Sequence, residues 1–325
     1  METLKILITD GHALFQDDVS LDVFDPFGTV TWRSRTHPND LQQLPADTDI
    51  IITNKYVIGQ RELDHFPKLR LIAVSATGYN CVDTVACRSR GISVCNVPAY
   101  GTHSVAQHAL ALLLHFSNRV ALHAGSVESG AWSRNADWCY TLTPIREWHG
   151  KTLGIIGMGR IGACLAGMAE ALGMQVIYHH TRDLGMPGRA FVDLHTLAAN
   201  SDVISLHCPL TPQTRHIVNA SFLGWMKREG VIINTSRGPL IDNEALADAL
   251  RSGKIAGALL DVLDTEPPPA DHPLIGCPNA IITPHIAWIS REARGRIIDT
   301  LRAILTGWNE GNLKYVVNLE DNNVK

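Results

Sequence analysis

Polar side chains that could carry out acid and base chemistry follow three apolar runs in the second half of the chain. The runs and the residues after them are 231–234 before Thr235, Ser236 and Arg237; 258–260 before Asp261 and Glu266; and 281–283 before Pro284 and His285. The runs read as parallel strands, and doubly wound sheets bind ligands outside the carboxyl ends of their strands. We therefore expect these side chains to meet at one edge of a sheet.

An arginine, a carboxylate and an imidazole together suit the reduction of a 2-keto acid. Hydride delivery to a carbonyl builds negative charge on oxygen, which a protonated imidazole can neutralise. A carboxylate bonded to the imidazole orients it and favours its charged form. A guanidinium binds carboxylate or carbonyl oxygens with planar geometry. We predict His285 as acid and base, Glu266 as its partner and Arg237 as the substrate clamp.

Each of these residues also has a structural interpretation. The chain has 15 histidines, so a histidine taken alone more often belongs to the core or the surface. Arg237 alone could cap a turn, and Glu266 before three prolines could be a solvated loop charge. Their joint placement after three strands is what favours catalysis.

A glycine-rich turn, Gly157-Met158-Gly159-Arg160-Ile161-Gly162, stands between an apolar run and a helix-compatible run. In a dinucleotide-binding turn the first glycine permits the tight bend, the second lets the backbone approach the pyrophosphate, and the third lets helix and strand pack closely. The helix N-terminus then offers N–H groups and a positive dipole to the phosphates. The alternative is an ordinary glycine turn, but its context predicts a dinucleotide site.

The end of the next predicted strand bears on which cofactor is used. An acidic residue there normally holds the ribose 2′-hydroxyl of NAD. This chain has His180 at that position, followed by Thr181 and Arg182, and its first carboxylate is Asp183. A cation and hydroxyl donors suit a 2′-phosphate, so we predict a slight preference for NADP(H) over NAD(H). The alternative is a solvated strand end with NAD also bound.

The composition favours a globular protein with two domains and limits its partners. The 325 residues are 45% hydrophobic and 18% charged, with a formal charge of −4, so nucleic acid and membrane are not expected partners. The seven cysteines form no CxxC pair, and the apolar run near the N-terminus is too short for a secretion signal, which predicts a cytoplasmic protein. No metal is expected, because His179 and His180 would point to opposite strand faces and no ligand cluster accompanies them.

Two series of short apolar runs, separated by segments of helical length, predict an α/β fold. The predicted strands are 6–9, 50–53, 71–75 and 92–96 in the first series, and 152–156, 175–179, 203–207, 231–235, 257–261 and 280–283 in the second. We predict a helix over 82–90, a long helix over 105–122, an irregular connection over 132–148 and a charged helix from about Ser290.

Nearly the whole chain resembles the D-isomer-specific 2-hydroxyacid dehydrogenases. The matching segments, in the family's order, are Ala76-Thr77-Gly78-Tyr79-Asn80 with Asp83, residues 101–108 and 150–157, Asn234-Thr235-Ser236-Arg237-Gly238, Asp261 to Glu266-Pro267, and residues 283–288. Thr53-Asn54-Lys55, residues 142–144, and Trp288 with residues 291–294 resemble the glycerate dehydrogenase (hydroxypyruvate reductase, glyoxylate reductase) branch. Tyr79 and Cys81 depart from that branch, where small or polar residues are more usual.

The resemblance implies a fold and a set of site residues. It implies two doubly wound parallel-sheet domains, with a Rossmann cofactor domain (101–288) inserted into a flavodoxin-like substrate domain (1–100 and 289–325), and a cleft that closes on the substrate. Arg237, Glu266 and His285 would be the catalytic set. The substrate would contact Asn54, Ala76, Thr77, Gly78, Arg237 and Trp288, with N–H groups around Thr77 holding its carboxylate. The cofactor would contact Thr77, Val105, Gly157, Gly159, Arg160, Ile161, Gly162, His180, Thr181, Arg182, Cys208, Pro209, Thr235, Ser236, Arg237, Asp261, His285 and Ala287.

The resemblance also implies a homodimer through residues 102–123. The leading hypothesis is an enzyme that interconverts hydroxypyruvate and D-glycerate, or glyoxylate and glycolate. The same fold could act on another small 2-keto acid. A third hypothesis is a nicotinamide-sensing corepressor or scaffold, which the intact Arg237, Glu266 and His285 set argues against.

Overall fold

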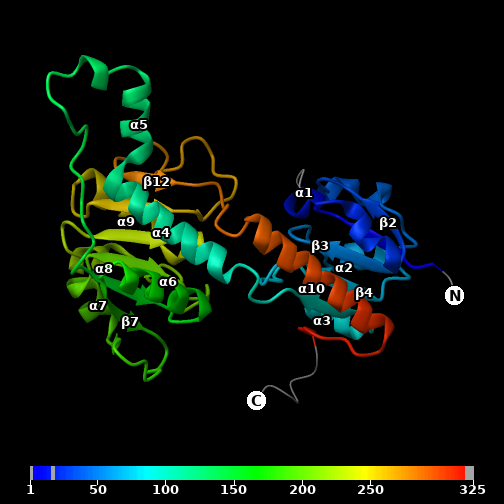
Figure 1. Ribbon diagram of the computed structural model, residues 1–325. Helices are drawn as coiled ribbons and strands as arrows, with labels where there is room; N and C mark the ends of the chain where they lie inside the picture. Colours follow the sequence, from blue (N-terminus) through cyan, green and yellow to red (C-terminus); the bar gives the residue numbers. More distant parts are fainter. Residues whose placement is uncertain (1–2, 16–18, 319–325) are drawn as a thin grey trace. The chain divides into compact units, whose positions relative to one another are not determined.

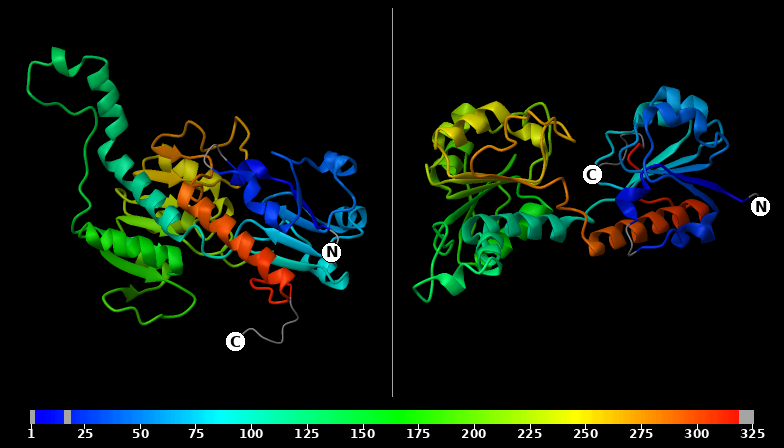
Figure 2. Two further views of the ribbon diagram at one scale, coloured as in Figure 1. Left: turned by 45° about the vertical axis from the view of Figure 1, so that its right-hand side comes forward. Right: turned by 90° about the horizontal axis from the view of Figure 1, so that it is seen from above.

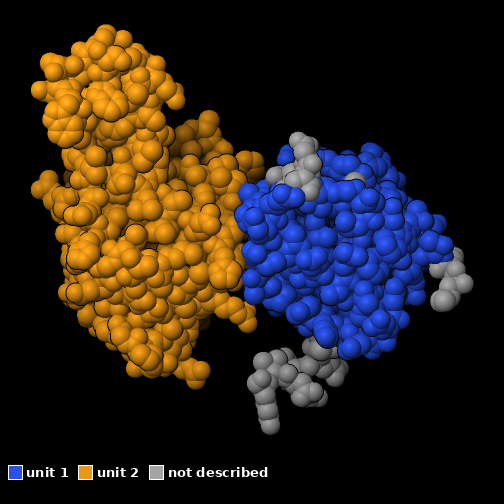
Figure 3. All heavy atoms as spheres, in the orientation of Figure 1, with its two compact units in different colours: residues 1–100, 289–325 blue, residues 101–288 orange. Residues whose placement is uncertain are grey.

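The computed structural model describes residues 3–15 and 19–318, so the end of the predicted C-terminal segment 289–325 lies outside the described residues. The chain divides into two compact units (Figure 3). Unit 1 contains residues 1–100 and 289–325, and unit 2 contains residues 101–288.

Unit 1 is built on a parallel sheet with the order β2-β1-β3-β4-β5. Its strands are β1 (Lys5–Ile8), β2 (Thr29–Trp32), β3 (Ile50–Thr53), β4 (Leu71–Val74) and β5 (Ser93–Asn96). This is the order of flavodoxin-like doubly wound sheets. Every residue of β3 and β4 is buried, because helices cover both faces of a parallel sheet.

The helices of unit 1 come from both ends of the chain. They are α1 (Gly11–Leu14), α2 (Gln60–His65), α3 (Thr84–Ser89) and α10 (Arg291–Asn309), with the 3₁₀ helices η1 (Leu21–Phe27) and η2 (Pro38–Gln43). The right-hand view of Figure 2 shows α10 on the opposite side of the sheet from α2. Arg294 of α10 is 3% exposed and donates to the carbonyl of Leu14, while Asn318 bonds the backbone of Val94. The C-terminal segment therefore completes the fold of the N-terminal one.

Unit 2 contains a seven-stranded parallel sheet with the order β12-β11-β10-β9-β6-β7-β8. Its strands are β6 (Thr152–Ile156), β7 (Gln175–His179), β8 (Ala190–Phe191), β9 (Val203–Leu206), β10 (Val231–Asn234), β11 (Gly257–Leu260) and β12 (Ala280–Ile282). Counted from β6, the strand order is that of a Rossmann sheet with one additional strand. All strands are parallel, and the direction in which successive strands are added to the sheet reverses between β6 and β9. The predicted fold class is confirmed.

Helices cover the two faces of this sheet with separate cores (Figures 1 and 2). They are α4 (Thr102–Asn118), α5 (Val120–Glu128), α6 (Arg160–Ala171), α7 (Leu194–Asn200), α8 (Ala220–Trp225) and α9 (Asn243–Arg251), with the 3₁₀ helices η3 (Trp132–Arg134) and η4 (Gly238–Leu240). Ile155 and Ile233 pack toward α4 and α6, while Ile156 and Ile232 pack toward α7, α8 and α9. Successive strand residues alternate between the two cores.

The structure differs from the sequence-based expectation in three places. The two-residue strand β8 and the strand β2 were not predicted, and the residues of β2 lie at a sheet edge and are mostly exposed. The predicted helix over 105–122 is two helices, because Arg119 adopts the left-handed conformation with φ +47° between α4 and α5. Residues other than glycine rarely adopt this conformation, so an arginine gives no sign in the sequence that the helix breaks at its position.

Candidate active site

The glycine turn of unit 2 contains two positions where a side chain would collide with backbone. Gly157 has φ +95°, and a Cβ added to it would lie 2.4 Å from the amide nitrogen of Cys208. A Cβ at Gly162 would lie 2.6 Å from the carbonyl oxygen of Gly157. The turn after β6 thus packs directly on the chain after β9, and α6 packs directly on the turn.

Gly159 differs from its neighbours, because no atom lies within 4 Å of the position its Cβ would take. It is the N-cap of α6 and offers no side chain to the first amides of the helix, whereas Asp193, Asn219 and Asp242 cap α7, α8 and α9. First-turn amides without a cap, at the positive end of a helix, bind anionic groups. The open space and these amides fit the pyrophosphate of a dinucleotide.

The end of β7 presents no carboxylate from residues 180 to 182. His180 is half-buried, and Thr181 and Arg182 are exposed. Asp183 Oδ1 accepts hydrogen bonds from the hydroxyl of Tyr178 at 2.6 Å and the amide of Gly185 at 2.9 Å. The Tyr178 hydroxyl and the Gly185 amide lower the pKa of Asp183. This carboxylate therefore organises its own loop.

The loop after β10 is held by the buried side chain of Asn234. Its Oδ1 accepts from the amide of Ser236 at 3.0 Å, and its Nδ2 donates to the carbonyl of Arg237 at 2.9 Å. Ser236 Oγ donates to the carbonyl of Cys208 at 2.8 Å, which ties this loop to the chain after β9. The Arg237 side chain is exposed, and its Nη1 donates to the carbonyl of Ser236 at 2.7 Å.

Thr235 lies in the same loop and is 8% exposed, yet its hydroxyl is buried without a hydrogen-bond partner in the described chain. Buried hydroxyls are normally satisfied, so an orphaned one at a predicted ligand site fits a group that the bound ligand supplies. Thr235 and the open face of Gly159 are the two observations that support a dinucleotide here.

The carboxylate of Asp261 is fully buried and holds the chain after β12. Its Oδ1 accepts from the hydroxyl of Thr283 at 2.5 Å and the amide of Ile286 at 2.9 Å, and its Oδ2 accepts from the amide of Ala287 at 2.8 Å. Burial opposes the charge, but bonds from His108, Thr283 and these two amides outweigh it and lower the pKa of Asp261. Its predicted contact with the cofactor stays a prediction, while its observed contacts are internal.

His285 and Glu266 form the closest contact between predicted catalytic residues. Nδ1 of His285 lies 2.6 Å from Oε2 of Glu266, and the amide of Leu263 donates to Oε1 of Glu266 at 3.1 Å. His285 has φ +56°, and its amide is bonded to the carbonyls of Asp261 and Thr283. Its side chain is 29% exposed, and no described residue bonds Nε2. The ring thus has one nitrogen fixed by a carboxylate and the other available to a ligand.

Two other histidines of unit 2 have structural surroundings. His272 is 6% exposed, with Nε2 at 2.9 Å from Asp264 and Nδ1 accepting from the amide of Leu274. His207 contacts Ser205 through Nε2 at 2.9 Å, and burial lowers its pKa to about 4. His207 is therefore neutral at physiological pH, and His285 is distinguished from His272 by its available nitrogen.

In unit 1 the predicted substrate residues lie at the carboxyl ends of β3 and β4. Within the described chain, the amides of Ala76, Thr77 and Gly78 donate to no protein acceptor. The loop is held by Thr77 Oγ1, which donates to the carbonyl of Val97, and by Asn96, which donates to the carbonyl of Thr77. Adjacent unpaired amides form a concave site that suits an anion such as a carboxylate.

Two side chains of α4 that were assigned no role fasten this helix to the His285 loop. Ser104 Oγ donates to the carbonyl of Ala287 at 2.6 Å. His108 Nε2 lies 3.0 Å from the hydroxyl of Thr283 and 3.4 Å from Oδ1 of Asp261. Their spacing of four residues places both on one face of a helix, which is the only signal the sequence offers. Val105 of the same helix, which is predicted to contact the cofactor, is buried.

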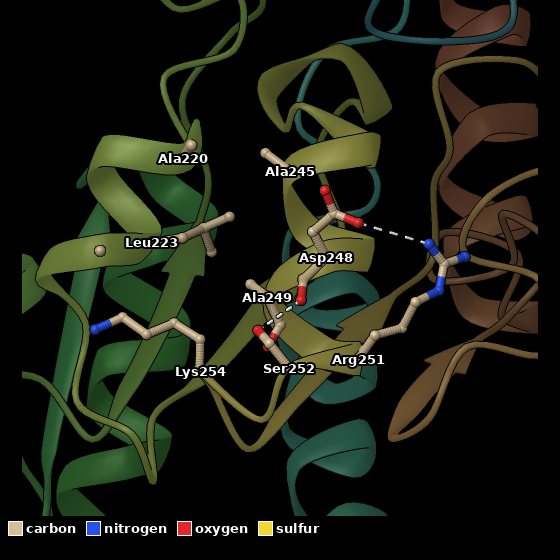
Figure 4. Close-up of a pocket in the computed structure, with 9 residues that line it drawn as sticks. Ala220, Leu223, Ala245, Asp248, Ala249, Arg251, Ser252 and Lys254 are labelled. Atoms are coloured by element: carbon tan, nitrogen blue, oxygen red, sulfur yellow. Dashed lines mark hydrogen bonds and ion pairs between the residues drawn. The ribbon is translucent and has the colours of Figure 1, made fainter.

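A cavity of about 600 Å³ lies in the groove between α8 and α9 (Figure 4). Its wall includes Leu223, Ala249 and Lys254, and on its rim Asp248 pairs with Arg251. It contains none of the predicted site residues. Residues 3–15 and 19–318 contain no group of three or more possible metal ligands. None of their helices is both long and apolar enough to cross a membrane.

The geometry of unit 2 defines a dinucleotide-binding domain of the dehydrogenase class, and comparison with known proteins defines the family. Residues 110–287 match the family model for the NAD-binding domain of D-isomer specific 2-hydroxyacid dehydrogenases. A hydroxypyruvate reductase of Blautia hydrogenotrophica is 41% identical over 97% of this chain and all of its own length. A glycerate dehydrogenase of Methylorubrum extorquens is 37% identical over 94% of this chain and 97% of its own.

Solved structures agree with these matches. An NADPH-dependent glyoxylate/hydroxypyruvate reductase of Sinorhizobium meliloti, solved with citrate, has a TM-score of 0.84 and 29% identity, and the match covers 97% of each chain. This chain belongs to the D-isomer-specific 2-hydroxyacid dehydrogenase family.

The two glycines of the turn give opposite expectations for alanine substitution. Gly157→Ala forces a Cβ against the Cys208 backbone at a positive φ, and we expect a loss of stability on the order of 1–3 kcal/mol or more. In Gly159→Ala the added Cβ meets no protein atom, so the free energy of unfolding should change by less than about 1 kcal/mol. The Kd for NAD(P)H should rise roughly tenfold, because the methyl group occupies the space proposed for the pyrophosphate. Thermal unfolding and nucleotide fluorescence titration measure both. Unchanged nucleotide binding in folded Gly159→Ala would contradict the phosphate assignment.

Proposed function

We propose that this chain is an NAD(P)-dependent oxidoreductase that interconverts a small 2-keto acid and its D-2-hydroxy acid, with hydroxypyruvate and D-glycerate, or glyoxylate and glycolate, as substrates. The observation that carries the proposal is the 2.6 Å contact between His285 and Glu266, with Nε2 of His285 left available beside a dinucleotide-binding sheet. The names of the related hydroxypyruvate reductase and glycerate dehydrogenase support the substrate class.

The bound nicotinamide would supply the hydride to the carbonyl carbon in reduction and accept it in oxidation. His285 would donate the proton from Nε2 to the carbonyl oxygen, so that hydride and proton together convert the ketone into an alcohol. Glu266 holds Nδ1 and thereby fixes which nitrogen faces the substrate. The Leu263 amide, by binding the second oxygen of Glu266, orients that carboxylate.

The substrate would be held through its carboxylate and carbonyl. Arg237 would bind these oxygens with its planar guanidinium, and the unpaired amides of Ala76, Thr77 and Gly78 would bind the carboxylate. Trp288 and Asn54 complete the proposed substrate set. The proposed cofactor contacts are the residues given by the family resemblance, and all of them except Thr77 lie in unit 2. A different small 2-keto acid would use the same groups.

Replacing the proposed acid tests the mechanism. His285→Ala should lower kcat by about 10²–10⁴-fold, because the developing oxyanion loses its proton donor. The Kd for NAD(P)H should stay within a factor of two. His195→Ala is a matched control, since His195 is an exposed histidine of the same unit on α7. Steady-state rates with hydroxypyruvate, glyoxylate and pyruvate, each with NADPH and NADH, give the comparison.

Turnover of His285→Ala close to that of the unaltered chain would overturn the acid and base assignment. A chain that binds NAD(P)H but reduces none of the three keto acids would favour a nicotinamide-sensing protein over an enzyme.

We further propose a preference for NADP(H). Residues 180–182 place no carboxylate at the end of β7, Asp183 is bound to Tyr178, and Arg182 is exposed there. The related reductase of Sinorhizobium meliloti, named as NADPH-dependent, supports this choice.

The preference is testable with the two cofactors as mutual controls. The unaltered chain should have a lower KM for NADPH than for NADH. Arg182→Ala should raise the KM for NADPH about tenfold and leave the KM for NADH within a factor of two, because only the 2′-phosphate needs the guanidinium. A clear preference of the unaltered chain for NADH would refute the proposal.

We also propose a homodimer through residues 102–123. No residue of α5 is buried, and Val120 and Leu122 are 64% and 48% exposed. Farther along, Trp132 and Trp138 are 52% and 85% exposed. Figures 1 and 2 show α5 and the segment after it extending away from the sheet of unit 2. Exposed large apolar side chains gathered in one segment are typical of an interface between copies.

Light scattering should give twice the chain mass, and Leu122→Glu should shift the protein toward the monomer, because a charge would be buried in the interface. Val85→Glu, at an exposed apolar residue of unit 1, should leave the mass unchanged. A monomeric unaltered chain at micromolar concentration would disprove the dimer. The seven cysteines are free thiols, which supports a cytoplasmic location that cell fractionation would check.

A further inference from the structure

Five buried polar side chains lie together at the carboxyl ends of β1, β3 and β4 in unit 1. They are Thr9, Asp10, Thr53, Asn54 and Ser75, and each is at most 7% exposed. We call this set the unit-1 polar network. Its residues come from three neighbouring strands of the sheet, and its last member directly precedes Ala76, the first of the three residues with unpaired amides.

Asp10 is the acceptor at the centre of the network. Its Oδ2 lies 2.9, 3.0 and 3.1 Å from the consecutive amides of Asn54, Lys55 and Tyr56. The hydroxyls of Thr9 and Thr53 lie 3.0 and 3.1 Å from the same oxygen. The chain leaving β3 is thereby wrapped around one carboxylate.

Asn54 passes this constraint to the neighbouring strand end. Its Nδ2 lies 3.1 Å from both the carbonyl oxygen and the hydroxyl of Ser75. Ser75 in turn donates through its hydroxyl and its amide to the carbonyl of Thr53, at 3.2 and 2.8 Å. Asn54 is predicted to contact the substrate, and its Nδ2 binds the residue before Ala76.

The network is costly, which points to a role besides stability. A buried carboxylate loses its hydration, and strand ends can be packed with apolar side chains at lower cost. Burial opposes the charge of Asp10, but the amides of Lys55, Asn54 and Tyr56 and the hydroxyl of Thr9 outweigh it and lower its pKa. The ionised carboxylate accepts hydrogen bonds and donates none, so it fixes the positions of the main-chain amides around it.

We propose that Asp10 is a positioning residue that, through Asn54 and Ser75, holds the amides of Ala76, Thr77 and Gly78 in place for the carboxylate of the 2-keto acid. This inference rests on the proposed function. Asp10 sets the affinity for substrate and has no part in the proton transfer, since His285 and Glu266 belong to unit 2.

The substitution Asp10→Asn tests the role with little change of shape. The amide oxygen can take the place of Oδ2, but it carries no charge and forms weaker hydrogen bonds, so the loop after β3 is held less firmly and Ser75 can shift. We expect the KM for the keto acid, and the Kd for the unreactive analogue oxamate, to rise about tenfold or more, since small displacements of binding groups have large effects. The value of kcat at saturation should fall less than threefold, and the Kd for NADPH should rise less than threefold, because all proposed cofactor contacts except Thr77 lie in unit 2.

Asp49→Asn is the matched control. Asp49 lies just before β3, at the opposite end of the same strand, and also binds a main-chain amide, that of Lys5, besides Arg70. A general loss of stability in unit 1 would affect both variants, whereas a positioning role raises the KM in Asp10→Asn alone. If Asp10→Asn does not fold, Thr53→Val decides, because it removes a hydroxyl from the network while keeping the shape. That variant should raise the Kd for oxamate severalfold.

The outcomes separate this inference from the proposed function. If the unaltered chain reduces no keto acid, the proposed function fails and the inference fails with it. If the unaltered chain is active and a folded Asp10→Asn binds oxamate as tightly as it does, only the positioning role is overturned. The same KM increase in Asp49→Asn would also overturn it, because the effect would then be general.

Discussion

The hydrogen bonds accepted by the buried carboxylate of Asp261 are the interactions on which the candidate active site of unit 2 depends. It lies at the end of β11 with a fully buried side chain, and it accepts from Thr283 and from the amides of Ile286 and Ala287. Taking one ionised carboxylate out of water costs several kcal/mol, so its donors must be held in good geometry. These donors flank His285, whose backbone is kept at φ +56° by bonds on both sides. A strained conformation of this kind persists only where its surroundings determine it.

Close contact between backbones places the other loops of this edge. Gly157 lies against Cys208, and a Cβ at Gly238 would lie 1.9 Å from the carbonyl carbon of Leu263. Leu263 is also the residue whose amide holds Glu266. The absence of side chains at these two glycines lets successive strand ends approach one another, and hydrogen bonds from Ser236 and Asp261 then join them in order. The proposed catalytic pair, His285 and Glu266, is therefore positioned by contacts that extend from β6 to β12.

The sequence was sufficient for the parts of the fold that are buried on both sides. Strands such as β3 and β10 are continuous apolar runs followed by turn residues, so their pattern is visible without a structure. The edge strand β2 has mostly exposed residues, and β8 has two residues, so neither has an apolar pattern of that length. The contact between His285 and Glu266 was predicted because both follow strands whose carboxyl ends must lie together.

The supporting residues were harder to predict, because their partners are distant in the sequence. His108 and Thr283 are 175 residues apart, and their contact depends on the rotation of α4 about its axis and on the position of β12 in the sheet. Asn54 is a residue whose position was predictable but whose hydrogen-bond partner was not. Its place at a strand end was clear, but which neighbour its amide would bind depended on the position of Ser75 across the sheet.

The two units solve the same physical problem with the same residue type. A loop that leaves a parallel strand at its carboxyl end has main-chain amides that the sheet no longer satisfies, and leaving them buried without acceptors is costly. In unit 1, Asp10 accepts three consecutive amides after β3, and in unit 2, Asp261 accepts two after β12. A carboxylate suits this purpose because both its oxygens only accept hydrogen bonds, and because its charge makes those bonds stronger than bonds to the neutral oxygen of an asparagine. The chain held by Asp261 continues from Ala287 into Trp288, and the network of Asp10 ends at Ser75, next to Ala76. Trp288 and Ala76 belong to the proposed substrate set, so the substrate would bind amides and side chains that the two aspartates do not use.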